Sequence, residues 1–394
     1  MKNALVFVAR PLSGLFVTVA LLGLVNHHAI AADGSPPGAD DFVSQVLQPF
    51  WQGQQMRETM FFIQADGTAM PSAALLFKPT KILSVTSATR DTAFEAGRDY
   101  EFDDDTGTIR LPKGSRIPFK TQAELYPLMT SKSPKIGGKR GDPTRGIFFG
   151  EGALYHGLQV EVTYTHEPGQ WKAYTPQFAG DVLPRTLKKL RGKEPVKILL
   201  SGDSISEGYN ASNFTKAKPG SPPYGELVAQ ALEKQYGSKV SFQNFAHAGW
   251  QSQSGLQQAA KEHLGAKKPD LVMIAFGMND VSYRNAAVYQ KNIKGIMDTI
   301  RKDSPETEFI LVAPMLGNPE FSLPMEQFPL YRDSLVKLGG PGVSVADMTS
   351  IWQEVLKRKS FYDLTGNGVN HPNDFGHRLY AQTIVALLVP PAKP

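Results

Sequence analysis

The sequence predicts a two-part fold, in which an all-β sandwich or jelly roll precedes a doubly wound α/β domain with a parallel five-stranded sheet. Before residue 167 the chain consists of short β-prone runs separated by turn residues. After residue 195, short apolar runs alternate with helical stretches. Of the 394 residues, 41% are hydrophobic and 20% are charged, a balance that excludes a wholly disordered, collagen-like or coiled-coil chain.

Residues 1–31 have the three parts of a secretory signal peptide. Lys2 and Arg10 supply positive charge, residues 12–25 are apolar but too short to span a membrane comfortably, and residues 29–31 (Ala-Ile-Ala) fit a cleavage site. The alternative is an uncleaved membrane anchor. We expect the mature chain to be secreted or periplasmic, with no membrane partner once the signal is removed.

Residues 32–180 are predicted to form the β-sandwich domain, after a short helix over 41–48. Its β-prone runs are 59–63, 75–77, 82–86, 100–102, 108–111 and 158–164. Strands this short and this closely spaced are typical of a sandwich or jelly roll. Residues 131–144 are rich in Lys, Gly and Pro and predict a long exposed loop. Residues 181–195 are interpreted as a linker.

Residues 196–394 are predicted to form the α/β domain. Its expected strands are 196–200, 240–244, 271–276, 309–312 and 343–346, and its expected helices are 224–236, 252–264, 286–302, 325–338, 350–358 and 375–388. Short apolar strands alternating with helices indicate a parallel sheet that is covered on both faces. In such sheets the functional groups lie at the carboxyl ends of the strands.

Three of these strand ends, and one late loop, carry side chains suited to acyl chemistry. Ser204 ends a Gly-Asp-Ser turn and is a candidate nucleophile. Gly249 offers a backbone N–H, and Asn279 a side-chain amide, to a developing oxyanion. His371 directly precedes the last helix and is a candidate general base. Turns and helix caps use the same residue types, so each signal is weak alone; the order of the four along one predicted sheet makes them strong together.

This ordered set of motifs resembles the SGNH (GDSL-type) hydrolases over residues 196–390. The resemblance implies a flavodoxin-like sheet of order 2-1-3-4-5. It also implies that Ser204 is the nucleophile and His371 the general base. The backbone N–H groups of Ser204 and Gly249, with the amide of Asn279, would then form the oxyanion hole.

One position departs from the family pattern. The family usually has an aspartate three residues before the histidine, where this chain has Gly368. A group that orients the imidazole is expected, because it fixes the tautomer and stabilises the imidazolium. The candidates are Asp363, Asn367 and Asp374, or a backbone carbonyl in a site that works as a Ser–His dyad. The sequence does not choose among them.

The signal and the resemblance together predict a secreted serine esterase that removes O-acetyl groups from carbohydrate. A β-sandwich before such a domain is similar to bacterial carbohydrate O-acetylesterases that act on plant cell-wall polymers. Trp250 is a candidate for stacking on a sugar ring, or it packs in the core. Two alternatives stay open. One is an envelope peptidoglycan or glycan O-acetylesterase or acetyltransferase, and the other is a non-catalytic glycan-binding protein, which the missing aspartate favours.

The composition of the chain limits the ligands and partners that it could bind. The formal net charge of +5 over the whole chain is too small to indicate nucleic acid binding. The absence of cysteine excludes a disulfide framework, a thiol nucleophile and cysteine-ligated metal. No His-Glu-x-x-His motif occurs, so neither a metal nor a cofactor is expected. The expected partner is an acetylated carbohydrate substrate, and the oligomeric state is not predicted.

Overall fold

The computed structural model of the chain describes residues 39–65 and 70–391. The predicted signal segment, residues 1–31, lies outside the described residues. Residues 36–394 belong to one compact unit. In the part of the chain that is described, no helix is long and apolar enough to cross a membrane.

A parallel sheet of five strands forms the C-terminal half, and its topology is the predicted one. The strands are β11 (Val196–Gly202), β12 (Val240–Asn244), β13 (Leu271–Ala275), β14 (Glu308–Val312) and β15 (Val343–Ala346). They pair in the order β12-β11-β13-β14-β15, and every pair is parallel. This is the 2-1-3-4-5 order that the family resemblance implies. Every residue of β13 and β14 is buried, as covering on both faces requires.

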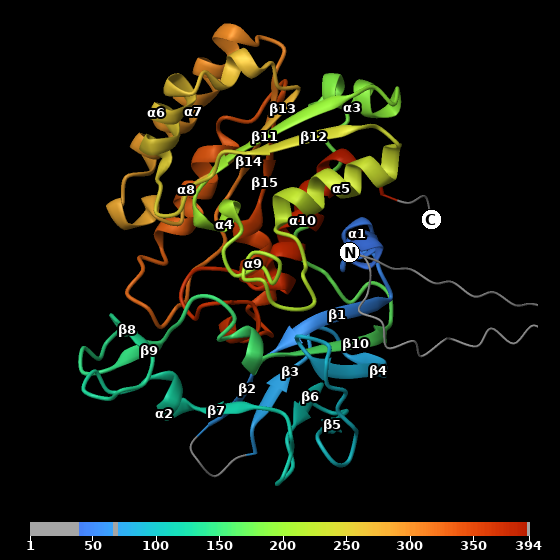
Figure 1. Ribbon diagram of the computed structural model, residues 1–394, viewed down its shortest axis with the longest axis vertical. Coiled ribbons are helices and arrows are strands. Elements are labelled where there is room, and N and C mark those ends of the chain that lie inside the picture. The colour runs from blue at the N-terminus through green and yellow to red at the C-terminus, as the bar shows by residue number, and fades with distance from the viewer. Residues whose placement is uncertain (1–38, 66–69, 392–394) are drawn as a thin grey trace, which may run out of the picture. The chain divides into compact units, whose positions relative to one another are not determined.

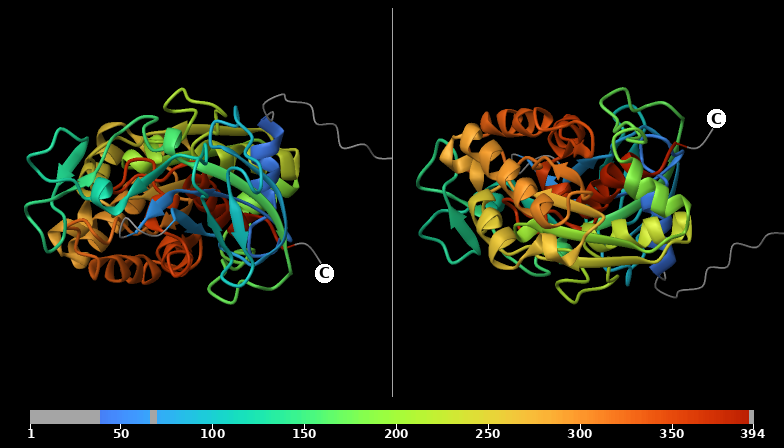
Figure 2. Two further views of the ribbon diagram at one scale, coloured as in Figure 1. Left: turned by 90° about the horizontal axis from the view of Figure 1, so that it is seen from below. Right: turned by 90° about the horizontal axis from the view of Figure 1, so that it is seen from above.

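Helices cover both faces of this sheet, as Figures 1 and 2 show from three directions. On one face α5 packs against α10, and on the other α6, α7 and α8 pack in sequence. Their bounds are α5 (Tyr224–Tyr236), α10 (Asp374–Leu388), α6 (Ser252–Lys261), α7 (Ala286–Asp303) and α8 (Gln327–Val336), and the remaining helices here are α3 (Pro184–Arg191), α4 (Ser204–Glu207) and α9 (Met348–Val355), with short 3-10 turns η2 (Leu264–Lys267), η3 (Asp280–Tyr283) and η4 (Phe361–Asp363). The predicted helix 224–236 and strand 240–244 have the observed bounds.

The N-terminal region is rich in short strands, as predicted. An antiparallel sheet has the order β1-β10-β4, and a second sheet has the order β5-β6-β3-β2-β7, in which only β2 and β7 pair in parallel. The bounds are β1 (Gln55–Met60), β2 (Phe62–Gln64), β3 (Ser72–Ala74), β4 (Pro79–Ser87), β5 (Glu101–Asp103), β6 (Thr108–Arg110), β7 (Phe119–Thr121) and β10 (Val160–His166), with α2 (Gln122–Leu125) and the turn η1 (His156–Leu158).

Two details of this region differ from the prediction. Residues 75–77 form no strand, although all three side chains are buried. The N–H of Leu76 donates to the Glu58 carboxylate and that of Phe77 to the Tyr164 hydroxyl, so side chains replace the strand partners. The expected loop 131–144 contains β8 (Lys135–Gly137), which pairs with β9 (Gly146–Phe148).

The strand-rich region and the parallel sheet share one hydrophobic core. Buried side chains from α1 (Ala39–Leu47), β1 and β10 belong to the same cluster as those of the central strands. Within the predicted linker 181–195, α3 buries Leu187 and Leu190 in this cluster. The domain boundaries at residues 180 and 195 stay a prediction.

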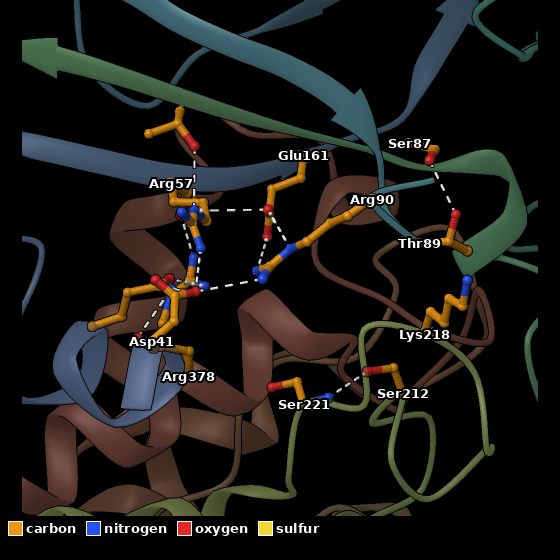
Figure 3. Close-up of polar contacts among 12 residues, drawn as sticks. Asp41, Arg57, Ser87, Thr89, Arg90, Glu161, Ser212, Lys218, Ser221 and Arg378 are labelled. Atoms are coloured by element: carbon orange, nitrogen blue, oxygen red, sulfur yellow. Dashed lines mark hydrogen bonds and ion pairs between the residues drawn. The ribbon is translucent and has the colours of Figure 1, made fainter. Parts of the chain in front are cut away.

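Charged groups reinforce the contact between α1, the three-stranded sheet and α10 (Figure 3). Asp41 on α1 pairs with Arg57 of β1 at 2.5 Å and with Arg90 at 3.4 Å. Arg90 also binds both carboxylate oxygens of Glu161, on β10, at 2.8 and 3.0 Å. Arg378 of α10 donates to the backbone carbonyl of Arg57. The N-terminal helix is therefore fixed from both sides.

A second polar contact between the two regions is completely buried. Lys359 lies 2.6 Å from a carboxylate oxygen of Glu58 on β1, and 3.5 Å from Asp363. The other oxygen of Asp363 accepts the backbone N–H of Phe61 at 2.7 Å. We call Glu58, Lys359 and Asp363 the buried junction. It fixes the strand-rich region to the segment that leads into the loop before α10.

Candidate active site

The candidate nucleophile lies in a tight turn at the carboxyl end of β11. Gly202 ends the strand, and a Cβ atom there would lie 2.3 Å from the Ser206 hydroxyl and 2.7 Å from the Ala275 carbonyl, so only glycine fits. Asp203 caps α4 by accepting the Ile205 N–H at 3.0 Å. Burial raises the pKa of Asp203 to about 7. Ser204 is the first residue of α4 and is buried.

His371 meets this serine from the loop that precedes α10. Its Nε2 atom lies 2.8 Å from the Ser204 Oγ atom. The loop is held by Asn367, whose side-chain oxygen accepts the backbone N–H groups of Val369, Asn370 and His371. The structure therefore brings the predicted nucleophile and the predicted base within hydrogen-bonding distance.

The second imidazole nitrogen, Nδ1, faces two oxygen atoms. It lies 3.1 Å from Oε2 of Glu151 and 3.1 Å from Oδ1 of Asn210. The Asn210 amide nitrogen donates to the carbonyls of Gly152 and Gly366, which fixes Oδ1 as the atom facing the ring. An oxygen on Nδ1 requires a proton there, so Nε2 is free to accept the proton of Ser204. We call Glu151, Asn210 and His371 the His371 junction.

Glu151 comes from the loop after β9, in the strand-rich region, and is 220 residues away from His371 in sequence. Its other carboxylate oxygen accepts the Asn367 amide at 3.0 Å. Partial burial acts to raise the pKa of Glu151, but the hydrogen bonds and charge of its neighbours, His371 first, outweigh this and hold the pKa below its usual value. Glu151 is therefore ionised at neutral pH.

The predicted orienting groups lie elsewhere. Asp363 belongs to the buried junction, where burial raises its pKa to about 6 against the opposing charge of Lys359. Asp374 is partly buried and accepts the backbone N–H of Ser212 at 2.7 Å. Neither carboxylate contacts the imidazole, and Asn367 acts on the loop backbone and on Glu151. The corrected candidates are Glu151 and Asn210.

The candidate oxyanion donors follow the neighbouring strands. The loop after β12 runs along the end of β11, with the Phe245 N–H on the Leu200 carbonyl and the His247 N–H on the Gly202 carbonyl. Gly249 in this loop has φ +76. Among residues 39–65 and 70–391, the backbone N–H groups of Ser204 and Gly249 have no acceptor in the chain. They are available to a ligand.

The Asn279 amide is held in place by one of its two N–H bonds. Its nitrogen donates to the Trp250 carbonyl at 2.8 Å, which leaves the second N–H free to donate. The next residue, Asp280, accepts the Ser252 hydroxyl at 2.5 Å and so fixes the start of α6 beside this loop. The arrangement suits a rigid donor for a developing oxyanion.

Aromatic side chains lie against His371 and in the loop that carries Gly249. Trp250 is partly buried: it packs on the core, and its ring contacts the His247 ring at an interplanar angle of 43°, with ring centroids 4.2 Å apart. The Tyr209 ring lies 5.0 Å from the His371 ring and 4.8 Å from that of Phe214, which is exposed. Trp250 therefore packs partly on the core, as one of the two predicted alternatives has it, and its stacking on a sugar ring stays a prediction.

A second histidine lies close by but is structural. His377, on α10, is completely buried, and burial lowers its pKa to about 4. Its ring nitrogens bond the Tyr209 carbonyl and the Tyr224 N–H. No group of three or more His, Cys, Asp or Glu side chains within the described residues could hold a metal ion.

Sequence reasoning missed Glu151 and Asn210. Gly368 at the position of the usual aspartate left the orienting group open, and nothing local in the sequence identified these two residues. Glu151 does stand between two glycines directly after an apolar run (residues 146–149), and this is the only signal that singled it out. Asn210 lies six positions after the nucleophile and carries φ +64, which only the structure reveals.

Comparison with solved structures finds partial matches. A two-domain esterase active on acetylated mannans is 23% identical, with 55% of this chain and 54% of that chain covered and a TM-score of 0.44. A lipase from goat rumen metagenome is 19% identical, with 49% and 97% covered and a TM-score of 0.41. A catalytic mutant of an acetylxylan esterase from Geobacillus stearothermophilus is 22% identical, with 49% and 94% covered and a TM-score of 0.38.

This chain spans about half the length of the two-domain esterase that it matches. A search of curated proteins finds no match. Residues 200–379 match the GDSL-like Lipase/Acylhydrolase family. This segment contains Ser204, Gly249, Asn279 and His371. Over residues 200–379 the chain is therefore similar to the GDSL-like Lipase/Acylhydrolase family.

Proposed function

We propose that the chain is a secreted serine esterase that removes O-acetyl groups from carbohydrate through a covalent acyl-enzyme. The observation that carries the catalytic part is the contact of 2.8 Å between Ser204 Oγ and His371 Nε2. A serine whose hydroxyl faces the unprotonated nitrogen of an oriented imidazole is an activated nucleophile. The free N–H groups beside it supply the second requirement, a site for an oxyanion.

In the proposed reaction, Ser204 Oγ attacks the ester carbonyl carbon while its proton passes to His371 Nε2. The negative charge on the carbonyl oxygen is met by the N–H groups of Ser204 and Gly249 and the amide of Asn279. The imidazolium then protonates the departing sugar oxygen, and the ester bond breaks. Water, deprotonated by His371, attacks the acyl-serine and releases acetate, which restores the free serine.

Two features support a carbohydrate substrate. The partly exposed Trp250 follows Gly249 in the chain, and the exposed Phe214 contacts Tyr209, whose ring lies beside that of His371, so a sugar ring could stack near the reacting ester. The predicted signal peptide would place the enzyme where polysaccharides occur. An acetyl group needs little pocket volume, in keeping with a polar site of this kind.

The test is acetate release from acetylated xylan, acetylated xyloglucan and O-acetylated peptidoglycan by the mature chain. Ser204→Ala should abolish release from every polymer. Ser201→Ala is the matched control, because the Ser201 hydroxyl is buried and has no hydrogen-bond partner among the described residues. Asn279→Ala should lower kcat by about 10²–10³-fold, as loss of an oxyanion donor does elsewhere.

The same experiment separates the alternatives. Release from peptidoglycan alone, or transfer of acetyl to a sugar instead of water, would indicate the envelope enzyme. No release from any polymer, with a Ser204 that does not react with a fluorophosphonate, would indicate the non-catalytic binding protein. Trp250→Phe should leave kcat on a small acetyl ester unchanged and raise KM only for the polymer; equal effects on both would contradict the stacking role.

A further inference from the structure

We propose that Glu151, from the strand-rich region, is the positioning carboxylate of the site and takes the place of the aspartate that Gly368 replaces. The proposal rests on the proposed esterase function and adds a residue outside the GDSL-like domain, which begins at residue 200. Ser204, His371 and Glu151 then form a triad drawn from both regions of the chain. Glu151 touches the histidine and not the substrate, so its effect passes through the imidazole.

The lack of space for a side chain at position 368 accounts for a glycine where the family usually has an aspartate. A Cβ atom on Gly368 would lie 2.2 Å from the Tyr155 hydroxyl and 2.4 Å from the Phe148 carbonyl. Those two groups bond each other at 2.5 Å, and Tyr155 is completely buried, so neither can move aside easily. Gly368 also has φ +89, which side-chain-bearing residues rarely adopt. No side chain fits here while the segment 148–155 keeps its place.

The segment that closes position 368 is the one that presents Glu151. Phe148 and Tyr155 lie on either side of the glutamate in sequence and anchor its loop in a hydrophobic cluster with Phe61 and Tyr362. The Asn210 amide binds the Gly152 carbonyl at 3.0 Å, and the Asn367 amide binds the glutamate itself. The carboxylate is thus held from three directions with one oxygen on His371 Nδ1.

Glu151 and Asn210 divide two tasks that one aspartate usually combines. The neutral oxygen of Asn210 is enough to keep the proton on Nδ1 and so to set the tautomer. Only Glu151 carries a charge, and a charge is what stabilises the imidazolium formed when Ser204 loses its proton. Removal of the charge should therefore cost less than in a triad where the same group also sets the tautomer.

Other groups facing His371 do not supply that charge. Tyr209 presents its ring. His377 stays neutral because burial lowers its pKa to about 4. Asp374 and Asp363 are engaged with Ser212 and with Lys359 and Phe61, as described above. Among the described residues, Glu151 is the carboxylate in contact with the ring.

The experiment compares Glu151→Gln, Glu151→Asp and Glu320→Gln in the full-length mature protein, with a small acetyl ester as substrate. Glutamine keeps the shape and loses the charge, whereas aspartate keeps the charge and is one methylene shorter. Glu320→Gln is the matched control: it also removes a half-exposed carboxylate that pairs across the two regions, with Lys139 at 3.4 Å, but it does not touch the imidazole.

We expect Glu151→Gln to lower kcat by about 10- to 100-fold with KM unchanged, which is the usual size of a charge-assisted hydrogen bond. Glu151→Asp should retain more activity than Glu151→Gln, and Glu320→Gln should match the parent. The acidic limb of the pH profile of kcat/KM should move to lower pH in Glu151→Gln. Added formate should restore part of the activity of Glu151→Ala.

The outcomes separate this proposal from the function it rests on. Parental kcat in Glu151→Gln, or Gln outperforming Asp, would overturn the positioning role while Ser204→Ala still abolished activity. If Ser204→Ala kept its activity, the proposed function itself would fail. A thermal melting temperature equal to that of the parent shows that each variant is folded, which the 40% exposure of the Glu151 side chain leads us to expect.

Discussion

Two polar junctions connect the strand-rich region to the segment that carries the histidine, and they differ in exposure. At the buried junction the side chains of Glu58, Lys359 and Asp363 are at most 1% exposed. At the His371 junction the Glu151 side chain is 40% exposed. Both contacts place a carboxylate against a cationic or protonatable partner across the same interface. The two junctions therefore differ in how much water their carboxylates keep, and only the His371 junction contains a residue of the candidate site.

Because the two junctions differ in exposure, the loss of a charge should change the stability of the fold by different amounts, and the cause is desolvation. Charges removed completely from water are tolerated only when paired, and loss of one partner leaves an uncompensated charge. A half-exposed carboxylate keeps part of its hydration, so its loss costs little stability and acts mainly on the group it touches. Stability variants and activity variants should therefore separate between the two junctions.

The largest effect should come from Lys359→Met at the buried junction. It leaves the carboxyl groups of Glu58 and Asp363 without their cation, and we expect the free energy of unfolding to fall by about 3–5 kcal/mol. Denaturant titration measures this. The control is Lys357→Met, two residues away, which removes an exposed pair with Glu354 and should cost less than about 1 kcal/mol. Similar losses in both variants would contradict the comparison.

Next in size is a pH effect at His377, behind the His371 junction. Its pKa is about 4 in the fold against 6.5 in the unfolded chain, so below pH 6.5 only the unfolded chain takes up the proton. Stability from the neutral ring is complete above pH 6.5 and is lost as pH falls towards 4, by about 3 kcal/mol. The difference in unfolding free energy between the parent and His377→Gln should shrink accordingly from pH 7 to 4.5.

A smaller loss is expected when a side chain is forced into position 368. Gly368→Ala should destabilise the fold by about 1–3 kcal/mol more than Gly114→Ala, because overpacking adds to the backbone strain. Gly114 has φ +88 against φ +89 at Gly368, but its Cβ would have no atom within 4 Å. Gly368→Asp should lower kcat instead of restoring a conventional triad, because it displaces the Glu151 loop. A kcat in Gly368→Asp that equals or exceeds that of the parent would show that position 368 has room for an aspartate side chain.

The smallest effect on catalysis is expected from a substitution at Asp363, which the sequence analysis names as a candidate for the group that orients the imidazole. Because it bonds Phe61 and Ser360 rather than the imidazole, Asp363→Asn should lower stability but leave kcat per folded molecule close to that of the parent. Activity normalised to active-site titration with a fluorophosphonate measures this. A large fall in kcat at unchanged folded fraction would return Asp363 to the site.

The comparison also shows how far the sequence could predict the molecule. The parallel sheet was predicted almost residue by residue, because its short apolar strands alternate with longer helices and three of them end at a polar motif. The three-residue strands β8 and β9 were not, since a run so short has no measurable period and pairs only after the fold has formed. The strand prediction for residues 75–77 is wrong because most buried apolar runs pair as strands. Here the side chains of Glu58 and Tyr164 accept the backbone N–H groups of residues 76 and 77 instead.

The residues of the candidate site also fall into a group that the sequence could predict and a group that it could not. Ser204, Gly249, Asn279 and His371 all follow or precede regular elements around one sheet, so the meeting of Ser204 with His371 could be predicted from topology. The partner of the imidazole could not, because it comes from a loop in the other region, and its approach depends on how Phe148 and Tyr155 pack against Gly368. Contacts between regions leave no periodic trace in the sequence.

The closed space at Gly368 has a consequence for inheritance. An exchange of genetic material that replaced the residues before 196 would bring a new loop against an unchanged glycine and leave His371 without its carboxylate. A reversion of the glycine alone would collide with Tyr155 and Phe148. If Glu151 has the proposed role, we expect neither half to be exchanged or repaired by a single event, and the strand-rich region and the residues after 196 to descend and diverge as one unit.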